Sequence, residues 1–286
     1  MTNPNLWNQL LIWPITNLLV AFYKLCEYFH IPGPLGFAII LLTISIRLIL
    51  YPLMHAQLKS AKKMSDLKPH MDAINAKHKD DKKAQQQAQL ALYKEHGVNP
   101  AAGCLPTLVQ FPILIALYNV FYQLLGSTNI EAFMADLNTI LYFPALHLTG
   151  LDFSFFGIHL GIKPSSWQTH GWWLLSIPVI TGLLQWYQTK LMMPPSKSLA
   201  VSSTPVETGQ KLSHAKQKNL KTEDSKPKTS DDMGDIQKQM AMITPVMFGF
   251  FALQFPLGLS LYWNVFGLFG IIQQLQVNKS TNPVQK

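Results

Sequence analysis

One arginine, Arg47, lies within the long uncharged stretch near the start of the chain, in the segment TISIRLILYPL. A charge in the middle of a membrane helix costs about 2.5–3.5 kcal/mol on insertion scales, so an arginine there calls for a reason. Thr43 lies one helical turn before Arg47, and Gln110 lies near the start of the second long apolar stretch. Gln273 and Gln274 end the last one. Polar side chains at a similar depth predict a shared hydrated cavity, open toward the cytoplasm.

Two simpler interpretations of these residues stay open. Arg47 could extend its side chain to the membrane surface, and each glutamine alone is more typical of a hydrogen bond between helices. No Asp or Glu lies in any predicted span. The counter-charge of Arg47 is therefore expected to come from outside the protein, on a transient and partly acidic guest.

Sequence motifs for other chemistry are missing. The chain has no GxxxxGK[ST], GxSxG, GxGxxG, HExxH or CxxC pattern, which are the patterns of nucleotide-binding loops, serine hydrolases, dinucleotide folds and metal sites. We therefore predict no catalytic residues, no metal and no cofactor. An enzyme is the least favoured class.

The composition indicates an integral membrane protein. Of the 286 residues, 48% are hydrophobic and 13% are charged, whereas about a quarter of the residues of an ordinary soluble protein are charged. Apolar runs of about 20 residues recur, which is the length that crosses a bilayer. The net charge of +8 is therefore interpreted by its location and not as a sign of nucleic-acid binding.

Five transmembrane helices are predicted in an all-α fold, and lysines set their orientation. Residues 55–103 carry nine Lys and residues 193–239 carry eight, whereas residues 126–171 carry only Lys163. Basic loops mark the cytoplasm. The predicted segments are 1–34 (external amphipathic helix at the interface), 35–54 (first span), 55–103 (cytoplasmic helical hairpin), 104–125 (second span), 126–171 (external loop), 172–192 (third span), 193–237 (disordered cytoplasmic loop), 238–256 (fourth span), 257–277 (fifth span) and 278–286 (cytoplasmic tail).

The N-terminal segment is predicted to lie on the membrane surface, with a break near Pro14. A sixth span is the open alternative. At 100° per residue the polar side chains of this segment share one side of a helix, which is taken as the water-facing side. These side chains are Gln9, Thr16, Asn17, Lys24, Glu27 and His30.

Three stretches resemble the membrane protein insertases of the YidC/Oxa/Alb family, in the bacterial YidC type with five spans. They are TISIRLILYPL with the hairpin that follows it, the NPAAGC motif before the second span, and PLGLSLYW in the last helical pair. The resemblance covers nearly everything from Leu35 to Val277 except the loop predicted to be disordered.

The resemblance implies five helices around a hydrophilic groove that is open to cytoplasm and lipid and closed to the outside. It implies that Arg47 is the groove arginine, that Thr43 and Gln110 face the same groove and bind substrate, and that Tyr262 and Trp263 form a lipid-side slide for a substrate segment. The hairpin would meet the Sec translocon, the ribosome or the signal recognition particle machinery.

The chain departs from the family pattern in two respects. No lipoprotein signal and no large external domain are expected, so the surface helix would replace that anchor. Phe266–Gly267 stands where many members carry small polar residues, so this position is not expected to line the groove.

The predicted function is insertion and folding of nascent membrane proteins in the bacterial cell membrane, alone or with the Sec translocon. The partners would be nascent membrane proteins, this targeting machinery and membrane lipids, with no sequence-specific nucleic acid. The N-terminus would be outside and the C-terminus cytoplasmic. A small-anion transporter that uses Arg47, or an assembly scaffold without insertase activity, are the alternatives.

Overall fold

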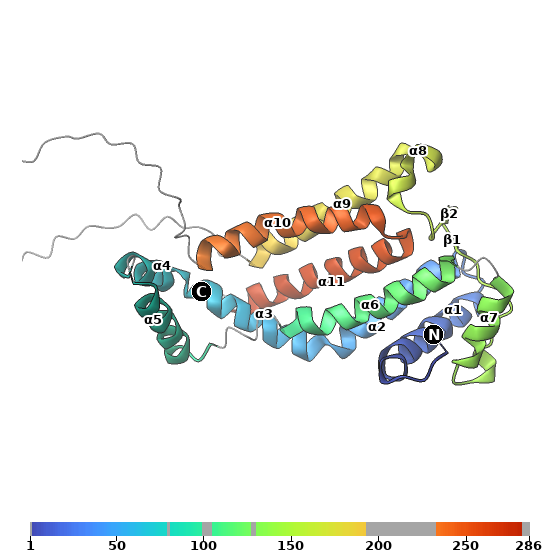
Figure 1. Cartoon of the computed structure of the whole chain (residues 1–286), viewed down its shortest axis with the longest axis horizontal. Helices are drawn as coiled ribbons and strands as arrows, with labels where there is room; N and C mark the ends of the chain where they lie inside the picture. Colours follow the sequence, from blue (N-terminus) through green and yellow to red (C-terminus); the bar gives the residue numbers. More distant parts are fainter. Residues whose placement is uncertain (1, 79–80, 99–104, 127–129, 193–232, 282–286) are drawn as a thin grey trace, which may run out of the picture.

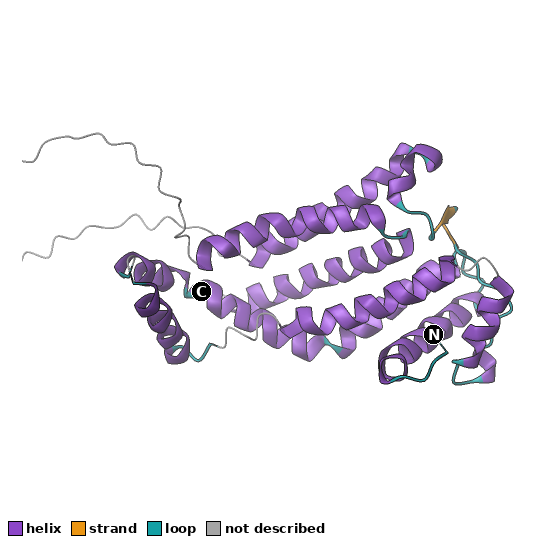
Figure 2. Ribbon diagram, viewed as in Figure 1, coloured by secondary structure: helices purple, strands orange, loops and turns teal. Residues whose placement is uncertain are grey.

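The computed structural model describes residues 2–78, 81–98, 105–126, 130–192 and 233–281, and this part of the chain is mostly helical (Figure 2). The long elements are α1 (Trp13–Tyr28), α2 (Pro34–Ile49), α3 (Tyr51–Asp66), α4 (Lys68–Lys77), α5 (Lys82–Glu95), α6 (Leu105–Gly126), α7 (Ile130–Thr139), α9 (Ser176–Met192), α10 (Met233–Gln254) and α11 (Leu257–Thr281). The shorter ones are a π-helical turn (Asn8–Ile12), α8 (Trp167–His170), three 3-10 turns (Pro144–Leu146, Pro164–Ser166, Trp172–Leu175) and the antiparallel hairpin of β1 (Ser154–Phe155) and β2 (Ile158–His159).

Helix α11 is the centre of the arrangement. It contacts α9 on one side and α2 and α6 on the other, and α9 packs along α10 (Figure 1). The α9–α10 contact is close because a Cβ on Gly249 would lie 3.3 Å from the carbonyl oxygen of Pro178, and small residues let helix backbones approach. On the α2 side, Leu42, Leu117 and Tyr262 are fully buried. Side chains of α2 and α9 can therefore both reach α11.

The first predicted span is divided in the structure. Helix α2 ends at Ile49, and α3 continues at an angle of 65° from Tyr51. Pro52 has no N–H to bond to the fourth carbonyl before it, which is the usual cause of such a bend. The sequence predicts one span over residues 35–54 and so places Arg47 too far from the helix end. Arg47 lies in the last turn of α2.

The N-terminal segment is helical past Pro14, where the sequence predicts a break, and Pro14 lies where the π-helical turn of Asn8–Ile12 passes into α1. Thr16 and Asn17 are buried, although both were predicted to face water. Asn17 Nδ2 donates to the carbonyl of Ile140 (2.9 Å), and the N–H of Tyr142 donates to Asn17 Oδ1 (2.7 Å). The polar side of this helix therefore meets a protein loop at these positions.

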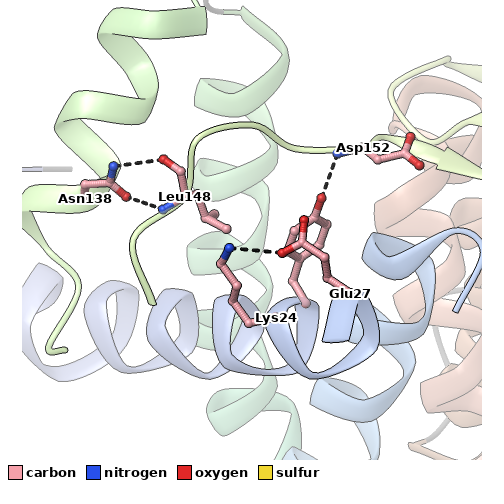
Figure 3. Close-up of polar contacts among 6 residues, drawn as sticks. Lys24, Glu27, Asn138, Leu148 and Asp152 are labelled. Carbon is pink, nitrogen blue, oxygen red and sulfur yellow. Dashed lines mark hydrogen bonds and ion pairs between the residues drawn. The ribbon is translucent and has the colours of Figure 1, made fainter. Parts of the chain in front are cut away.

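The loop of residues 140–152 makes a second contact with α1, at Tyr23. The N–H of Asp152 donates to the Tyr23 hydroxyl (3.0 Å), and Asn138 exchanges two hydrogen bonds with the backbone of Leu148 (Figure 3). Lys24 and Glu27 form an ion pair of 3.0 Å on the more exposed side of α1. Residues 140–152 thus follow α1 and contact its side chains Asn17 and Tyr23.

The β-hairpin closes one end of the bundle. The ring of Phe155 lies in a notch of α2, where a Cβ on Gly36 would be 2.0 Å from the ring. Beyond the hairpin, the carbonyls of Leu160 and Ile162 accept hydrogen bonds from the N–H groups of Gly258 (2.8 Å) and Leu257 (2.9 Å). They satisfy two of the donors that a helix N-terminus leaves open. The first turn of α11 is thereby held by the hairpin segment.

Helices α4 and α5 lie at the opposite end of the bundle (Figure 1). They pack on each other around a small core of Leu67, Tyr93 and Val98. Asn75 Oδ1 accepts from both Gln85 (2.9 Å) and Gln89 (2.8 Å), and the side chain of Asp81 caps α5. This pair is therefore a separate small unit joined to the bundle through α3.

Two segment boundaries differ from the sequence prediction. Residues 193–232 of the loop predicted over 193–237, and the NPAAGC motif at 99–104, lie outside the described residues. Helix α10 already begins at Met233, which lies inside that predicted loop. Helix α11 continues to Thr281, which lies inside the predicted tail. The turn between α10 and α11 falls at Phe255 and Pro256, next to the boundary predicted between the fourth and fifth spans.

By length and composition alone, few of the described helices qualify as membrane spans. Asn8–Tyr28 is long and apolar enough, and the bent pair of α2 and α3 qualifies if it is counted as one span. The described apolar part of α10, Met242–Gln254, is shorter than a full crossing. The alternative of an N-terminal span therefore stays open.

Candidate functional site

Arg47 is buried against α11. Its side chain is 4% exposed, and it is the only charged side chain among the buried residues of the described chain. Nη1 donates to Gln273 Oε1 (3.0 Å), Nη2 donates to the backbone carbonyl of Phe266, and the guanidinium carbon lies 3.5 Å from the centre of the Phe266 ring. Among the described residues, no carboxylate is paired with it. Neutral oxygens and an aromatic face therefore hold this charge.

Arg47 is also the only arginine in the chain, since every other basic side chain that counts toward the charge is lysine. A lysine loses its proton readily when it is buried, whereas arginine stays charged and its planar group stacks on aromatic rings. Arg47 is buried and its guanidinium lies on the ring of Phe266, so both properties of arginine matter at this position. The residue type is therefore matched to a site that must keep a positive charge away from water.

Gln110, one of the predicted groove residues, is hydrogen-bonded to α11. Its Nε2 donates to the Tyr262 hydroxyl (2.8 Å), and the Tyr262 ring stacks on Phe266 with centroids 5.9 Å apart. Gln110 is thus linked to Arg47 through two aromatic residues of α11. Thr43 is fully buried one turn before Arg47, but its hydroxyl donates to the carbonyl of Ile39 in its own helix (2.7 Å).

The two predicted slide residues lie on different sides of α11. Tyr262 is fully buried beside Gln110. Trp263 is partly exposed and lies tilted against the ring of Phe248 of α10, with centroids 4.4 Å apart. It lines a small pocket with Thr181 and Ser260. Tyr262 therefore belongs with the buried polar group of Arg47, and Trp263 with the surface between α9 and α10.

Several buried polar atoms around α11 have no hydrogen-bond partner among the described residues. They lie on both sides of the helix, and buried polar atoms of this kind are normally satisfied by water or a bound group. The site therefore has the polarity of a hydrated interior, although α11 covers Arg47 where the sequence predicts an open groove. The atoms are Arg47 Nε, Gln110 Oε1, Ser260 Oγ, Asn264 Oδ1, Gln273 Nε2 and Gln274 Oε1.

Three residues at the site were missed or misplaced by the sequence prediction. Phe266 covers Arg47, although it was not expected to line the site. Gly270 lets α11 approach, because a Cβ there would lie 2.8 Å from Arg47 Nη2 and 2.5 Å from Gln188 Nε2. Gln188 lies in a polar part of the predicted third span, with Gln185, Thr189 and Lys190 close by, so its position alone does not single it out. For Gly270 and Phe266, nothing in their residue types points to the site.

Comparison with known proteins decides the family. The sequence profile of the 60Kd inner membrane protein family matches residues 28–285 of this chain. The chain belongs to this family. The relatives include the membrane protein insertase YidC of Geobacter metallireducens, at 31% identity over 96% of this chain, and the membrane protein insertase MisCA of Bacillus subtilis, at 31% identity over 95%. The assignment to the YidC/Oxa/Alb family is thereby confirmed.

A solved structure agrees with this family membership. It is the crystal structure of an active YidC insertase with its first transmembrane domain resolved. Its TM-score with this chain is 0.52 at 26% identity, covering 97% of this chain and 47% of that one. The chain spans 38% of the length of the Geobacter relative and 78% of MisCA. The mostly helical fold is therefore that of a 60Kd inner membrane protein, within a family of bacterial inner membrane proteins.

Gly270 offers a test of the site in this family member. Under the insertase activity proposed below, Gly270→Ala is expected to lower insertion of a membrane protein with an acidic flank by about threefold to tenfold, because the new methyl group displaces the ends of Arg47 and Gln188. Stability should not fall, since alanine is favoured over glycine in a helix by about 0.5–1 kcal/mol. Insertion into proteoliposomes and thermal unfolding in detergent measure the two effects.

Gly267→Ala is the matched control, three residues away on the same helix. A Cβ at Gly267 would meet no atom within 4 Å, so this variant should insert like the wild type. Equal insertion by both alanine variants would show that the fit at Gly270 does not matter.

Proposed function

We propose that this chain is a membrane protein insertase and chaperone, which inserts nascent membrane proteins into the bilayer and helps them fold. The observation that carries the proposal is the buried charge of Arg47, held by α11 without a carboxylate and surrounded by unpartnered polar atoms. Relatives that share about a third of its residues are named membrane protein insertases. No bond is made or broken in this process, so no catalytic residue and no cofactor are required.

The proposed membrane arrangement has five spans, formed by α2, α6, α9, α10 and α11. The lysine-rich segments place α4 and α5 in the cytoplasm and the β-hairpin outside, with the N-terminus outside and the C-terminus inside the bacterial cell membrane. In this arrangement α1 lies at the outer surface. The backbone contacts that residues 140–142 make with Asn17 support that position, since loops of this kind are placed outside the hydrocarbon core.

In the proposed mechanism, the polar flank of a client enters from the cytoplasm and passes beside Arg47 and Gln110, with Thr43 in the same wall. A carboxylate on the flank is attracted to Arg47 more strongly than in water because the surroundings have a low dielectric constant. The apolar client segment then moves along the surface near Trp263 into the lipid. Burial of that segment supplies the driving force, at about 0.8 kcal/mol per CH₂ group.

We further propose that the α4–α5 pair is the contact site for the Sec translocon, the ribosome and the signal recognition particle machinery. Residues 55–103 are rich in lysine, and positive surfaces favour association with acidic partners. Lys77, Lys83 and Lys94 are exposed on this pair, and the core of Leu67, Tyr93 and Val98 occupies its inner side.

The test is insertion of a short single-span client with an acidic N-terminal flank into proteoliposomes. Protection of the flank from added protease is scored against empty liposomes of the same lipid composition. Protection above the empty liposomes is the expected result. If wild-type protein adds nothing, the insertase function is wrong, and two further assays separate the alternatives: anion uptake for a transporter, and assembly of a pre-inserted complex for a scaffold.

A further inference from the structure

We propose that Phe266 is a movable cap on Arg47, and that it sets how readily the site accepts an acidic group. This inference rests on the proposed insertase function and adds a specificity-determining residue to it. Phe266 is a positioning residue here, because it acts through Arg47 and not on the client directly.

The first observation is that one residue covers Arg47 in two ways. The Phe266 ring lies 3.5 Å from the guanidinium carbon, and the carbonyl of the same residue accepts from Nη2. Gln273 Oε1 accepts a hydrogen bond from Nη1, while Nε has no partner among the described residues. An arginine has five N–H donors. The guanidinium is therefore covered by Phe266 but is not saturated with acceptors.

The second observation concerns the two sides of the ring. On one side Phe266 stacks on Tyr262, whose hydroxyl accepts from Gln110 (2.8 Å). On the other side the ring is not enclosed, because Phe266 is only partly buried whereas Arg47 beneath it is buried. Phe266 is therefore held in the covering position from one side and is open on the other.

The third step is the chemistry of displacement. A cation over a ring face is attracted to it, but a carboxylate attracts the same cation more strongly and can bind it with two parallel hydrogen bonds. An acidic client can therefore replace the ring, and the orphaned Nε then gains an acceptor. A neutral client has no group that competes for Arg47. Phe266 therefore slows the binding of acidic clients only, because only an acidic client must displace the ring to reach Arg47.

The sequence supplies a clean probe, because Arg47 is the only arginine. The water-soluble reagent p-hydroxyphenylglyoxal modifies arginine side chains, and mass spectrometry of the peptide that holds Arg47 gives its rate of modification. We expect Phe266→Leu to raise this rate about fivefold to tenfold, because leucine fills space without an aromatic face. Phe266→Trp should leave the rate at or below the wild-type value.

Phe250→Leu is the matched control for this change. Phe250 is 57% exposed on α10, and its ring packs against Phe251, away from Arg47. It should not change the rate. Thermal unfolding of all variants shows whether each one is folded. Phe266→Met, which also lacks an aromatic face, takes the place of Phe266→Leu if the leucine variant does not fold.

Insertion is measured on the same proteoliposomes with two clients that differ by one Asp→Asn change in the flank. We expect Phe266→Leu to insert the acidic client about threefold to tenfold faster at limiting protein and the neutral client at the wild-type rate. Arginine modification that is unchanged in both Phe266 variants overturns the cap. A faster modification with slower insertion of the acidic client also overturns it, because Phe266 would then hold Arg47 in its working position.

Failure of the proposed function gives a different result. In that case even the wild type inserts neither client above empty liposomes, while the rate of arginine modification still reports on the cap. If that rate rises in Phe266→Leu, the cap exists and the client assigned to the site is wrong.

Discussion

Replacing Arg47 with alanine is expected to slow insertion of an acidic-flank client by about 10- to 100-fold. A hydrogen bond to a charged group contributes about 1.5–3 kcal/mol, and 1.4 kcal/mol corresponds to a factor of ten. Arg47 is buried in the last turn of α2, where its charge is poorly screened. The same assay as for the wild type, protease protection of the flank, measures this loss.

Arg47→Lys separates charge from shape. Lysine keeps a positive charge but cannot stack flat on Phe266 or present two parallel donors. We therefore expect this variant to insert the acidic client at a rate between those of the wild type and Arg47→Ala. If lysine is as inactive as alanine, the planar group is required and not the charge alone.

The client supplies the control for the electrostatic argument. With an Asp→Asn flank, the difference between wild type and Arg47→Ala should nearly disappear, since the pair that it reports on no longer exists. If alanine slows both clients equally, Arg47 acts on the protein's own structure, and the attraction to a client carboxylate is not part of the mechanism.

Arg47→Ala should also lower the stability of the fold. Loss of the guanidinium leaves Gln273 Oε1 and the carbonyl of Phe266 without the donor that each has in the wild type, and an unsatisfied buried acceptor costs about 1–3 kcal/mol. Thermal unfolding measures this loss, and the Asp→Asn client separates it from the loss of attraction to a client carboxylate.

The sequence indicates the polar residues of the candidate site more readily than the aromatic residues that pack around them. Arg47 and Gln110 stand out because a polar residue in an apolar stretch requires a reason. Phe266 and Tyr262 do not stand out, since an aromatic residue in a span is equally suited to lipid and to the interior. Their place against Arg47 depends on how α11 rotates relative to α2, and this rotation is set by packing over the whole bundle.

The N-terminal segment shows a second limit of periodicity. Helical spacing correctly groups Thr16 and Asn17 on one side, but it cannot say whether that side meets water or protein. Residues 140–142 lie more than a hundred positions away in the sequence and supply the backbone partners of Asn17. Pro52 is different, because its missing N–H is a local property, and the bend after α2 could have been predicted from it.

Gly36→Leu is expected to lower stability by about 1–3 kcal/mol, the usual cost of forcing a larger side chain into a packed site. The Cβ alone would lie 2.0 Å from the ring of Phe155, so the ring must leave its notch. Phe155 is also packed edge-to-face on Phe37, with centroids 5.4 Å apart. Thermal unfolding measures the loss. Gly150→Leu is the control, because a Cβ at Gly150 meets nothing within 4 Å.

The effect of Gly36→Leu should extend beyond the notch itself. The hairpin segment continues into the carbonyls that accept from Leu257 and Gly258, so displacing Phe155 releases the first turn of α11. Hydrogen exchange at these two amides should therefore speed up in Gly36→Leu and not in Gly150→Leu. A lower unfolding temperature without faster exchange would show that the substitution disturbs only the packing of Phe155 on α2. Faster exchange would show that the hairpin holds the helix that carries Phe266 and Gln273, and that the closed end of the bundle and the arginine site are parts of one rigid element.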